Sequence, residues 1–389
     1  MASRRVTFTL FAVAYGTNTS TPLLILYRDR LSLSATGLTA VFAVYAAGLL
    51  PALLVAGPLS DRLGRRRVAL PFVVLSALAS LLFLPAASAF PLLLTARFVQ
   101  GLVSGAFFSV ASAWLQDLAP PERPTLPAVQ ASLAMNGGFA VGPLVAGLLA
   151  QYLPGPFVVP FLLHIALVAV GLVVLLPAGD VLAPRATGSL VRIALPRAGR
   201  RAFWTVVAPT AVWVFAFPAV GITLFPLLLP DGHPPVAFVG LLAGATLGTA
   251  ALVSPYAARF GGWTAPAGIT VGAVGYVLGV VGADTSVLPL LVVGGVALGV
   301  GAGFALNAGL GTAQRLADPA TRGAVNSAFY ACAYGGFALP VLLSAVAGES
   351  ALSPALLVLA GVAVAVAGWL ALPTHRAVLR PHAVLGPAG

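Results

Sequence analysis

The sequence predicts an all-α integral membrane protein in which twelve transmembrane helices form two pseudo-symmetric bundles of six. Hydrophobic residues make up 60% of its 389 residues and charged residues only 7%, and the mean hydropathy is +1.03. Soluble domains carry roughly 25% charged residues, so this chain has too few charges to cover a water-soluble globule. Apolar runs also follow one another at about the 20 residues that a helix needs to cross a bilayer.

The apolar runs predict where the twelve helices lie and how they group. We expect spans at residues 6–27, 36–57, 68–89, 91–116, 127–150, 157–178, 203–228, 235–257, 265–283, 287–311, 323–347 and 352–372. The longest polar connection holds five arginines and divides the chain near its middle. We therefore expect an N-terminal six-helix bundle over 1–178, a cytoplasmic linker over 179–202, and a C-terminal six-helix bundle with a short cytoplasmic tail over 203–389.

The arginines predict the direction of the spans. All 20 basic residues are arginine, and 17 of them fall before the first span or after an even-numbered one. Because positive residues concentrate in cytoplasmic loops, we expect a multi-pass protein of the cell inner (cytoplasmic) membrane with both termini cytoplasmic. The net charge of +11 then reflects orientation rather than a nucleic-acid partner. As partners we expect the lipid bilayer and a small-molecule substrate, and we expect a monomer.

The densest cluster of charge follows the second span. The stretch Gly57-Pro58-Leu59-Ser60-Asp61-Arg62-Leu63-Gly64-Arg65-Arg66-Arg67 carries five charged residues between two apolar runs, which places it at a membrane surface. It resembles the signature loop between the second and third helices of the major facilitator superfamily of transporters, G-x-L-x-D-R-x-G-R-[KR]. The matching residues are Gly57, Leu59, Asp61, Arg62, Gly64, Arg65 and Arg66.

This resemblance implies a gate. In the family, the Asp and Arg of this loop hold the two halves together on the cytoplasmic side in the outward-facing state, and an acid at the end of the fourth helix completes the network. Asp117 has that position here. Alternatively, the arginines only anchor the loop in solvent at the membrane surface. The expected gating residues are Gly57, Asp61, Arg62, Gly64, Arg65, Arg66 and Asp117.

A weaker copy of the same stretch indicates an internal repeat. Ser254–Gly261 aligns with Gly57–Gly64 at an offset of 197 residues, and both follow the second span of their half. Many transporters are built from such repeats. The second copy has Ala258 where the first has Asp61, so we expect the two halves to differ in their gate contacts.

Arg97 is the one arginine inside a predicted span. A charge near the centre of a transmembrane helix costs roughly 2.5–3.5 kcal/mol on insertion scales, so a functional role or an escape to the surface is expected. Arg97-Phe98-Val99-Gln100-Gly101 resembles the family's fourth-helix pattern R-x-x-Q-G, which implies that Arg97 and Gln100 take part in proton coupling. The alternative is that Arg97 extends toward the outer surface.

The fifth span carries a third resemblance. The stretch Gly138-Phe139-Ala140-Val141-Gly142-Pro143-Leu144-Val145-Ala146-Gly147 resembles the family's antiporter motif G-x-x-x-G-P-x-x-G-G. It departs from that motif at Ala146, where the motif has glycine. The spacing puts Gly138 and Gly142 on one face for close helix contact, and Pro143 removes a backbone hydrogen bond. The resemblance implies export through Gly138, Gly142, Pro143 and Gly147. A packing face of small residues is the alternative.

The predicted spans hold no carboxylate at mid-depth, because all nine acids fall at span ends or in loops. The remaining candidates for carrying a proton are Asp29, at the outer end of the first span, and His164, in the sixth span. A histidine titrates near physiological pH. Alternatively, His164 is a structural residue of an apolar helix.

Polar and aromatic residues at mid-span depth predict a cavity for an apolar or amphipathic solute, although helix packing is the alternative for each of them. Residues at four-residue spacing share a helix face, as in the seventh and eleventh spans. The expected cavity residues are Tyr15, Asn18, Tyr45, Asn136, Trp213, Phe217, Asn326, Tyr330 and Tyr334.

These features favour a secondary active transporter that is similar to the drug:proton antiporter branch of the family. It would export small hydrophobic or amphipathic compounds by alternating access, with a proton gradient as the energy source and no cofactor. A metabolite or sugar uptake carrier, or a uniporter, on the same fold is the alternative. The sequence shows no metal-ligand cluster, nucleophile–base set or phosphate-binding loop, so we expect no metal site and no enzyme.

Overall fold

A computed structural model describes residues 1–120, 122, 126–179, 199–229, 234–317 and 322–380. Within these residues each of the twelve predicted spans is helical. Nine helical stretches of the described residues are long and apolar enough to cross a membrane, and one of them, Val236–Asp284, contains two antiparallel helices. The predicted all-helical membrane fold is confirmed.

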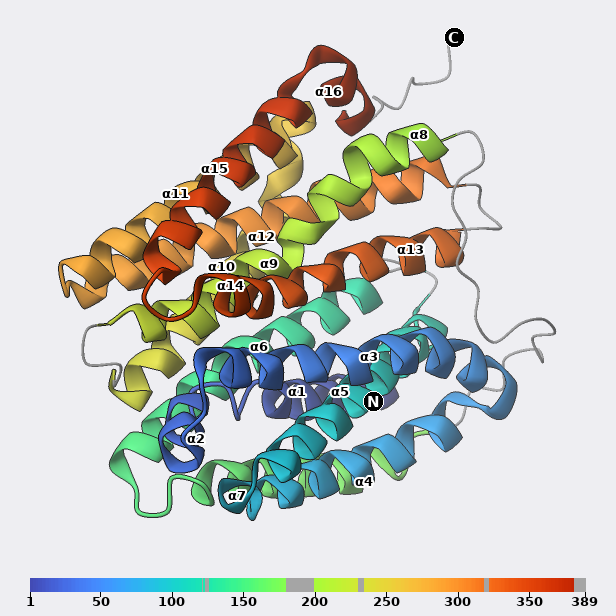
Figure 1. The fold of residues 1–389 in the computed structure, drawn as a ribbon. Coiled ribbons are helices and arrows are strands. Elements are labelled where there is room, and N and C mark those ends of the chain that lie inside the picture. Colours follow the sequence, from blue (N-terminus) through green and yellow to red (C-terminus); the bar gives the residue numbers. More distant parts are fainter. Residues whose placement is uncertain (121, 123–125, 180–198, 230–233, 318–321, 381–389) are drawn as a thin grey trace, which may run out of the picture.

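The first half of the chain forms one group of helices, seen in blue to green in the lower part of Figure 1. Its long helices pack on one another, with α3 against α5 and α1 against α6 and α7. Its elements are α1 (Ala2–Thr17), α2 (Leu24–Leu31), α3 (Ala35–Leu63), α4 (Arg65–Phe83), η1 (Ala86–Ser88), α5 (Phe90–Asp117), α6 (Leu126–Tyr152) and α7 (Val159–Leu175).

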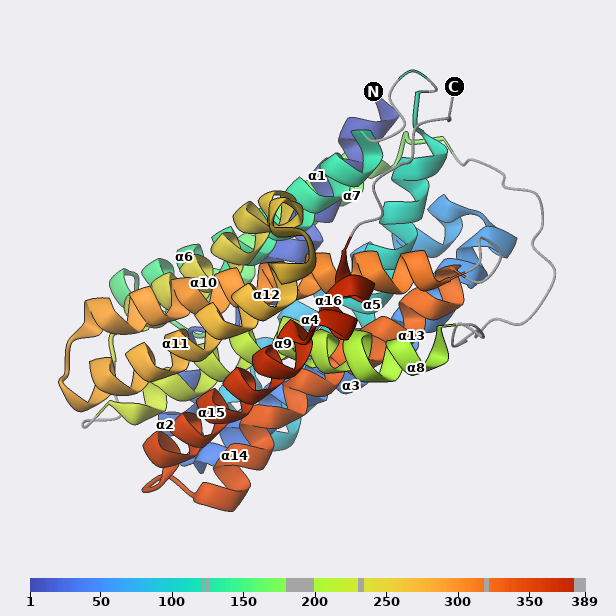
Figure 2. The same cartoon turned by 90° about the horizontal axis from the view of Figure 1, so that it is seen from above.

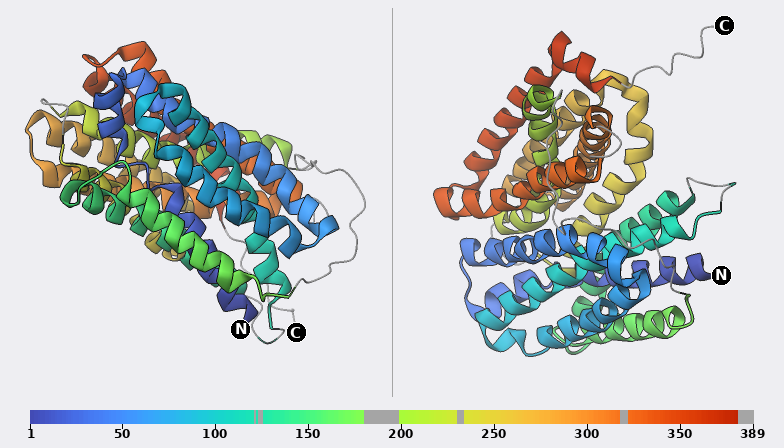
Figure 3. Two further views of the ribbon diagram at one scale, coloured as in Figure 1. Left: turned by 90° about the horizontal axis from the view of Figure 1, so that it is seen from below. Right: turned by 90° about the vertical axis from the view of Figure 1, so that its right-hand side faces the viewer.

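The second half forms the other group, in yellow-green to red, and the right-hand view of Figure 3 shows the two groups one above the other. Short 3₁₀ and π segments interrupt its helices. Its elements are α8 (Arg200–Ala202), η2 (Phe203–Val207), α9 (Ala208–Leu224), η3 (Phe225–Leu228), α10 (Val236–Ala257), η4 (Ala258–Trp263), α11 (Thr264–Asp284), α12 (Leu288–Leu316), α13 (Arg322–Tyr334), η5 (Gly335–Ala338), α14 (Leu339–Ala347), α15 (Leu352–Ala371) and α16 (Pro373–Leu379).

Two predicted boundaries are wrong. The first span is broken, because α1 ends at Thr17 and α2 begins at Leu24. Pro22 lies in the break and has no N–H to continue the helix. The predicted signature loop is also almost entirely helical: α3 runs to Leu63 and α4 starts at Arg65.

One glycine therefore makes the whole turn between α3 and α4. Gly64 has φ 100°, a left-handed conformation that glycine adopts at little cost. The residue aligned with it in the second half, Gly261, has φ 53° in the turn between α10 and α11. The weak sequence repeat thus coincides with a repeated backbone turn.

The apolar cores follow the two halves. One buried cluster draws on the first half, including Phe107 and Trp114, and another on the second half, including Tyr276 and Phe329. A third cluster mixes both halves around Phe337. Figure 2 shows α6 and α10 lying side by side where the halves meet. The boundaries of the predicted bundles stay a prediction, because residues 180–198 of the linker lie outside the described part.

Contacts near the helix ends define what we call the arginine-rich end, made of the starts of α1, α4 and α6, the ends of α3, α5, α7 and α12, and α16. In the first half, Ser3 Oγ donates to Gln130 Oε1 at 2.6 Å and Arg66 Nη2 to the Leu176 carbonyl at 2.8 Å. In the second, Arg315 Nη2 donates to the Leu379 carbonyl at 3.1 Å. This is the end predicted to be cytoplasmic, and we call the other the opposite end.

Candidate functional site

Arg97 lies on α5 beside the break between α1 and α2, and it is only 1% exposed. Its Nη1 donates to the Thr17 carbonyl at 3.3 Å, to Ser20 Oγ at 3.1 Å and to Gln100 Oε1 at 2.8 Å. Its Nε donates to the Val41 carbonyl of α3 at 3.3 Å. The side chain is therefore held inside the protein and does not extend to the surface.

The broken helix supplies the negative partner that Arg97 otherwise lacks. No carboxylate is among the contacts of Arg97 in the described residues. The last carbonyls of a helix have no intrahelical donor and together resemble about half a negative charge. Arg97 binds the carbonyl of Thr17, and Gln100 Nε2 donates to that of Gly16 at 2.5 Å. Arg97 and Gln100 thus cap the C-terminal end of α1.

Aromatic rings cover the remaining face of the guanidinium. Its carbon lies 5.0 Å from the ring centre of Phe42 and 5.1 Å from that of Tyr45, which is within cation–π range. Phe337 from the second half packs on the same two rings, at 5.7 Å from Phe42 and 6.2 Å from Tyr45. The site therefore lies where the two halves meet.

Further rings of the second half extend this contact. Phe215 of α9 stacks on Tyr334 at 4.4 Å and on Phe337 at 5.2 Å, and Tyr330 lies 6.3 Å from Tyr334. We call this group the inter-half aromatic cluster. Its members are Phe42, Tyr45, Phe215, Tyr330, Tyr334 and Phe337.

The structure separates two other expected cavity residues from this cluster. Trp213 and Phe217 belong to the buried core of the second half, and a Cβ at Gly272 or Gly301 would meet the Phe217 ring. Phe215, two residues before Phe217, faces the cluster instead. The four-residue spacing of Trp213 and Phe217 coincides with a face buried in this core, and their place in a substrate cavity stays a prediction.

The polar candidates lie in three places. Tyr15 and Asn18 are at the end of α1 beside Arg97, and the buried Tyr15 hydroxyl has no partner among the described residues. Asn326 Oδ1 of α13 is also buried and unpartnered in that part of the chain. Asn136 of α6 instead donates from Nδ2 to Ser132 Oγ, one turn earlier on the same helix, at 3.0 Å.

His164 of α7 packs against the same helix end as Arg97. It is 2% exposed, and its Nδ1 lies 2.6 Å from Ser80 Oγ of α4. Its ring touches Gly16 so closely that a Cβ there would overlap it, and it stacks on Tyr15 at 6.2 Å. Its Nε2 is buried with no hydrogen-bond partner in the described residues.

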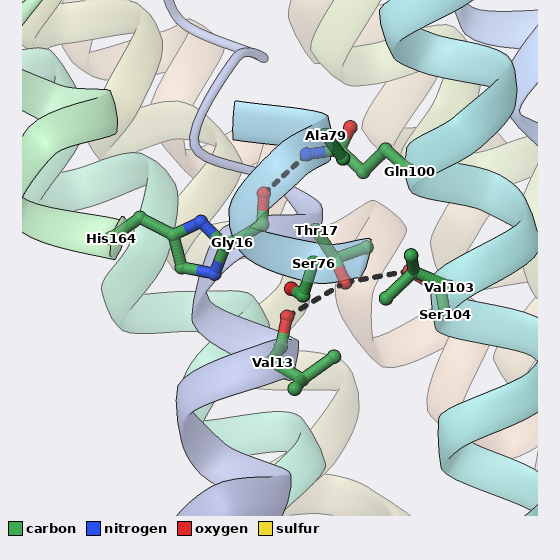
Figure 4. Close-up of a pocket in the computed structure, with 9 residues that line it drawn as sticks. All are labelled: Val13, Gly16, Thr17, Ser76, Ala79, Gln100, Val103, Ser104 and His164. Carbon is green, nitrogen blue, oxygen red and sulfur yellow. Dashed lines mark hydrogen bonds between the residues drawn. The ribbon is translucent and has the colours of Figure 1, made fainter. Parts of the chain in front are cut away.

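A small polar cavity lies beside this ring, shown in Figure 4. It leaves about 10 Å³ for the centre of a water molecule, which is room for about one water. Thr17 Oγ1 and Ser104 Oγ are 3.0 Å apart on its wall. The lining residues are Val13, Gly16, Thr17, Ser76, Ala79, Gln100, Val103, Ser104 and His164.

The expected gating residues lie at the arginine-rich end. Arg65 forms an ion pair with Asp61 one turn earlier, and its Nε donates to Asp117 Oδ2 at 2.7 Å. Its Nη1 also donates to Ser60 Oγ at 2.6 Å. These contacts join α3, α4 and the end of α5, all in the first half. Asp61 pairs with the first turn of α4 but does not cap it.

Three more residues complete this group. Gly57 faces Ser109 of α5 at close range. Arg66 reaches the end of α7, and Arg62, in the last turn of α3, also has a bonding partner. The predicted cluster is thus brought together in space, and its role as a gate stays a prediction.

The glycines of α6 face both halves. A Cβ at Gly138 or Gly142 would meet the backbone of α1 at Tyr15. A Cβ at Gly147 would instead meet α10 at 2.8 Å from the Val236 carbonyl, and the Pro143 carbonyl faces Gly240 of α10. This stretch therefore packs the end of α1 on one side and the second half on the other.

At the opposite end the two halves are tied together. Arg28 Nη2 of α2 contacts both carboxylate oxygens of Glu349 at 3.0 Å, and Glu349 Oε1 accepts from the Ala35 backbone N–H at 3.0 Å. Gln151 Oε1 likewise accepts from the Val236 N–H at 2.8 Å. The neighbouring Asp29 is exposed and has its own bonding partner.

Sequence reasoning did not identify Glu349, Ser80, Gly16 or the aromatic residues Phe42, Phe215 and Phe337. Their partners are far away along the chain, and an isolated serine or phenylalanine in an apolar run carries no signal of its own. The spacing of Tyr330, Tyr334 and Phe337 on one helix face was the available hint for Phe337.

Comparisons with known proteins match this fold. The family model described as Major Facilitator Superfamily matches residues 6–340. Multidrug resistance protein MdtL of Shewanella oneidensis is 33% identical over 146 residues, 38% of this chain and 35% of that protein. The MdtL protein of Escherichia coli O139:H28 is 41% identical over 93 residues, 24% of each chain. The chain thus aligns with about a third or less of the length of these relatives.

Solved structures share the complete architecture at low identity. A mutant of the peptide transporter POT has a TM-score of 0.81 at 16% identity, covering 97% of this chain and 95% of that one. A POT family transporter in complex with 5-aminolevulinic acid has a TM-score of 0.74 at 15% identity, covering 94% of each. Such identities show the fold alone. The helical fold agrees with the family model, which covers most of the chain. This chain therefore belongs to the Major Facilitator Superfamily, whose members are multi-pass secondary transporters and not enzymes.

Proposed function

We propose that the protein exports small hydrophobic or amphipathic compounds by alternating access, with proton antiport as the driving reaction. The observation that carries this proposal is the inter-half aromatic cluster beside the buried guanidinium of Arg97. A binding site between the two halves is exposed to one side of the membrane at a time as the halves rock against each other.

The composition of the site favours one class of solute. Stacked aromatic rings offer flat apolar faces, and several of the rings are tyrosines whose hydroxyls orient a polar group. The nearby charge is the positive charge of Arg97, with no carboxylate among its described contacts. Neutral or anionic aromatic compounds therefore fit the site better than cations.

The contacts between halves support alternating access. They include charged and polar bonds at the opposite end, between Arg28 and Glu349 and between Gln151 and Val236. At the arginine-rich end the ion pairs of Arg65 stay within the first half. With the arginine-rich end in the cytoplasm, this arrangement corresponds to an inward-facing state, ready to take a solute from the cell.

Two resemblances support export over uptake. The α6 stretch that resembles the antiporter motif packs against the end of α1 on one side and against α10 of the second half on the other. A movement of α6 would therefore shift both of these helices. The partial relatives are multidrug resistance proteins, which favours drugs as the cargo.

The experiment is transport by the purified protein in proteoliposomes with an imposed pH gradient of either sign. The panel contains neutral, anionic and cationic aromatic antibiotics and dyes, with protein-free liposomes as the control. We expect a proton gradient directed into the lumen to drive neutral or anionic aromatic compounds out. Equal flux without any gradient would instead identify a facilitator, and sugar or metabolite transport would favour the uptake alternative.

A further inference from the structure

We propose that the cavity beside His164 is the proton-binding site of this transporter, in which one water molecule hydrogen-bonds Nε2 and the imidazole carries the coupling proton. This inference rests on the proposed proton antiport. Three features of the site support it: a water-sized polar cavity, a buried Nε2 with no hydrogen-bond partner in the described part of the chain, and a hydrogen bond at Nδ1 that holds the ring.

The cavity has the size and chemistry for a water molecule. Its volume matches about one water, and Thr17, Ser76, Ser104, Gln100 and His164 give it polar walls. Genuinely empty cavities are apolar. A water here would also satisfy Nε2, which otherwise stays buried and unpaired in the described residues.

The bond to Ser80 is compatible with either tautomer of the neutral ring, because a hydroxyl can accept from Nδ1–H or donate to Nδ1. The proposal requires the Nδ1–H tautomer. When Nδ1–H donates to Ser80 Oγ at 2.6 Å, Nε2 keeps its lone pair and faces Gly16 and the cavity. Nε2 then accepts a proton from the water side, forming one N–H bond and an imidazolium. Release breaks the same bond and returns the proton to water, so the cycle is balanced.

Few other ionisable groups face His164. The helices packed on α7 are α1, α4 and α6. On α1 the neighbour is Tyr15, while Arg4 and Arg5 lie at its start. The charges of α4, Arg65–Arg67, are also at its start, and Tyr152, the ionisable residue of α6, is exposed at its end. Arg97 of α5 reaches the ring through Gln100 and the Gly16 carbonyl.

This connection links the proton to a conformational change. Arg97 and Gln100 already bind the end of α1, which offers about half a negative charge. A second positive charge on His164, on the other side of Gly16, leaves two cations sharing one weak counter-charge in a medium of low dielectric constant. Protonation therefore favours a rearrangement of the α1–α2 break, to which Tyr45 and the aromatic cluster are joined through Arg97.

Histidine chemistry at this site is tested first without any substrate. In nanodiscs, ¹⁵N-histidine NMR of the whole protein should show one signal that is absent in His164→Gln and has the Nδ1–H tautomer, with Nε2 unprotonated at neutral pH. His375→Gln, which changes a half-buried histidine near the C-terminal end of the chain, is the matched control. The Nε2–H tautomer in the wild-type protein would overturn the proposal.

Transport supplies the second test. With a compound from the panel that the wild-type protein exports, His164→Gln should lose gradient-driven export but keep exchange of that compound across the membrane without a gradient. Ser80→Ala keeps the His164 imidazole but removes its hydrogen bond, so it should shift the pH dependence of export. If His164→Gln does not fold, the Ser80→Ala result tests the site instead. Unchanged gradient-driven export in His164→Gln, or an export driven by sodium instead of protons, would overturn the site.

The two proposals fail in different ways. If the wild-type protein exports nothing from the panel, the proposed function fails, whereas an Nε2–H tautomer overturns the site whatever the protein transports. If the wild-type protein exports with a proton gradient and His164→Gln does the same, the function stands and the site is wrong.

Discussion

Arg28 and Glu349 are 321 residues apart in the sequence, yet the Arg28 Nη2 contacts both carboxylate oxygens of Glu349 at 3.0 Å. Glu349 also accepts the backbone N–H of Ala35 at the start of α3. One turn further into the bundle, Thr39 and Ser344 hydroxyls are 2.8 Å apart. A single carboxylate of the second half thus holds α2 and α3 of the first half and closes the opposite end.

Glu349→Gln is expected to loosen this closure. The pair is partly exposed, with side-chain exposures of 19% and 52%, so its contribution is roughly 0.2–1 kcal/mol. That corresponds to an increase of up to about fivefold in the population open at the opposite end. Distances between spin labels on α3 and α14 measure it, in a background where Cys332 is replaced by Ser. Arg30→Ala, which changes the other arginine of α2 beside Arg28, is the control. Equal label distances in Glu349→Gln and Arg30→Ala would exclude a gate at this end.

Arg97→Ala is expected to abolish coupled transport while the protein still inserts in the membrane. The substitution leaves the Thr17 carbonyl and Gln100 Oε1 without a donor, at a cost of about 1–3 kcal/mol for buried unpaired groups. Transport in proteoliposomes and the midpoint of thermal unfolding in detergent measure the two effects. Arg97→Lys keeps the charge but not the guanidinium geometry, so it should recover stability more than transport. Normal coupled transport by Arg97→Ala would contradict the coupling role.

Asp117→Asn and Asp61→Asn are each expected to slow transport without changing insertion. Both acids bind Arg65, which is 7% exposed, so the two substitutions should be non-additive in a double-mutant cycle. Initial transport rates at saturating substrate provide the measurement. Glu122→Gln, at an exposed acid of the same end, should leave the rate unchanged. Wild-type rates in both single variants would favour the simple anchor of the membrane surface.

Gly142→Ala is expected to destabilise the protein and to impair transport. The added methyl group would overlap the Tyr15 backbone of α1, and overpacking of this kind costs about 1–3 kcal/mol. Gly137 of the same helix offers a matched control, because a Cβ there would meet only the Phe11 ring, at 3.7 Å. Thermal unfolding should therefore separate Gly142→Ala from Gly137→Ala. Equal unfolding midpoints would show that α6 does not need this close approach.

The sequence predicted the helices well because hydrophobic length is a local property of the chain. Each of the twelve apolar runs is helical, and the charged stretch after the second run lies at a helix end. The sequence did not predict two changes in the backbone. Pro22 lies where the first span breaks, and Gly64 alone makes the turn inside the stretch that was expected to be a loop. The orientation in the membrane stays a prediction from the arginines.

The chemistry of the site was decided by tertiary structure. The sequence by itself determined that Arg97, Gln100 and His164 lie in apolar helices, but not what balances a buried cation without an acid. Only the folded chain brings the carbonyls of Gly16 and Thr17 to Arg97 and Gln100, and Gly16 to His164. Arg28 and Glu349 meet for the same reason. Such contacts depend on which helices pack together, and no residue pattern within one helix contains that information.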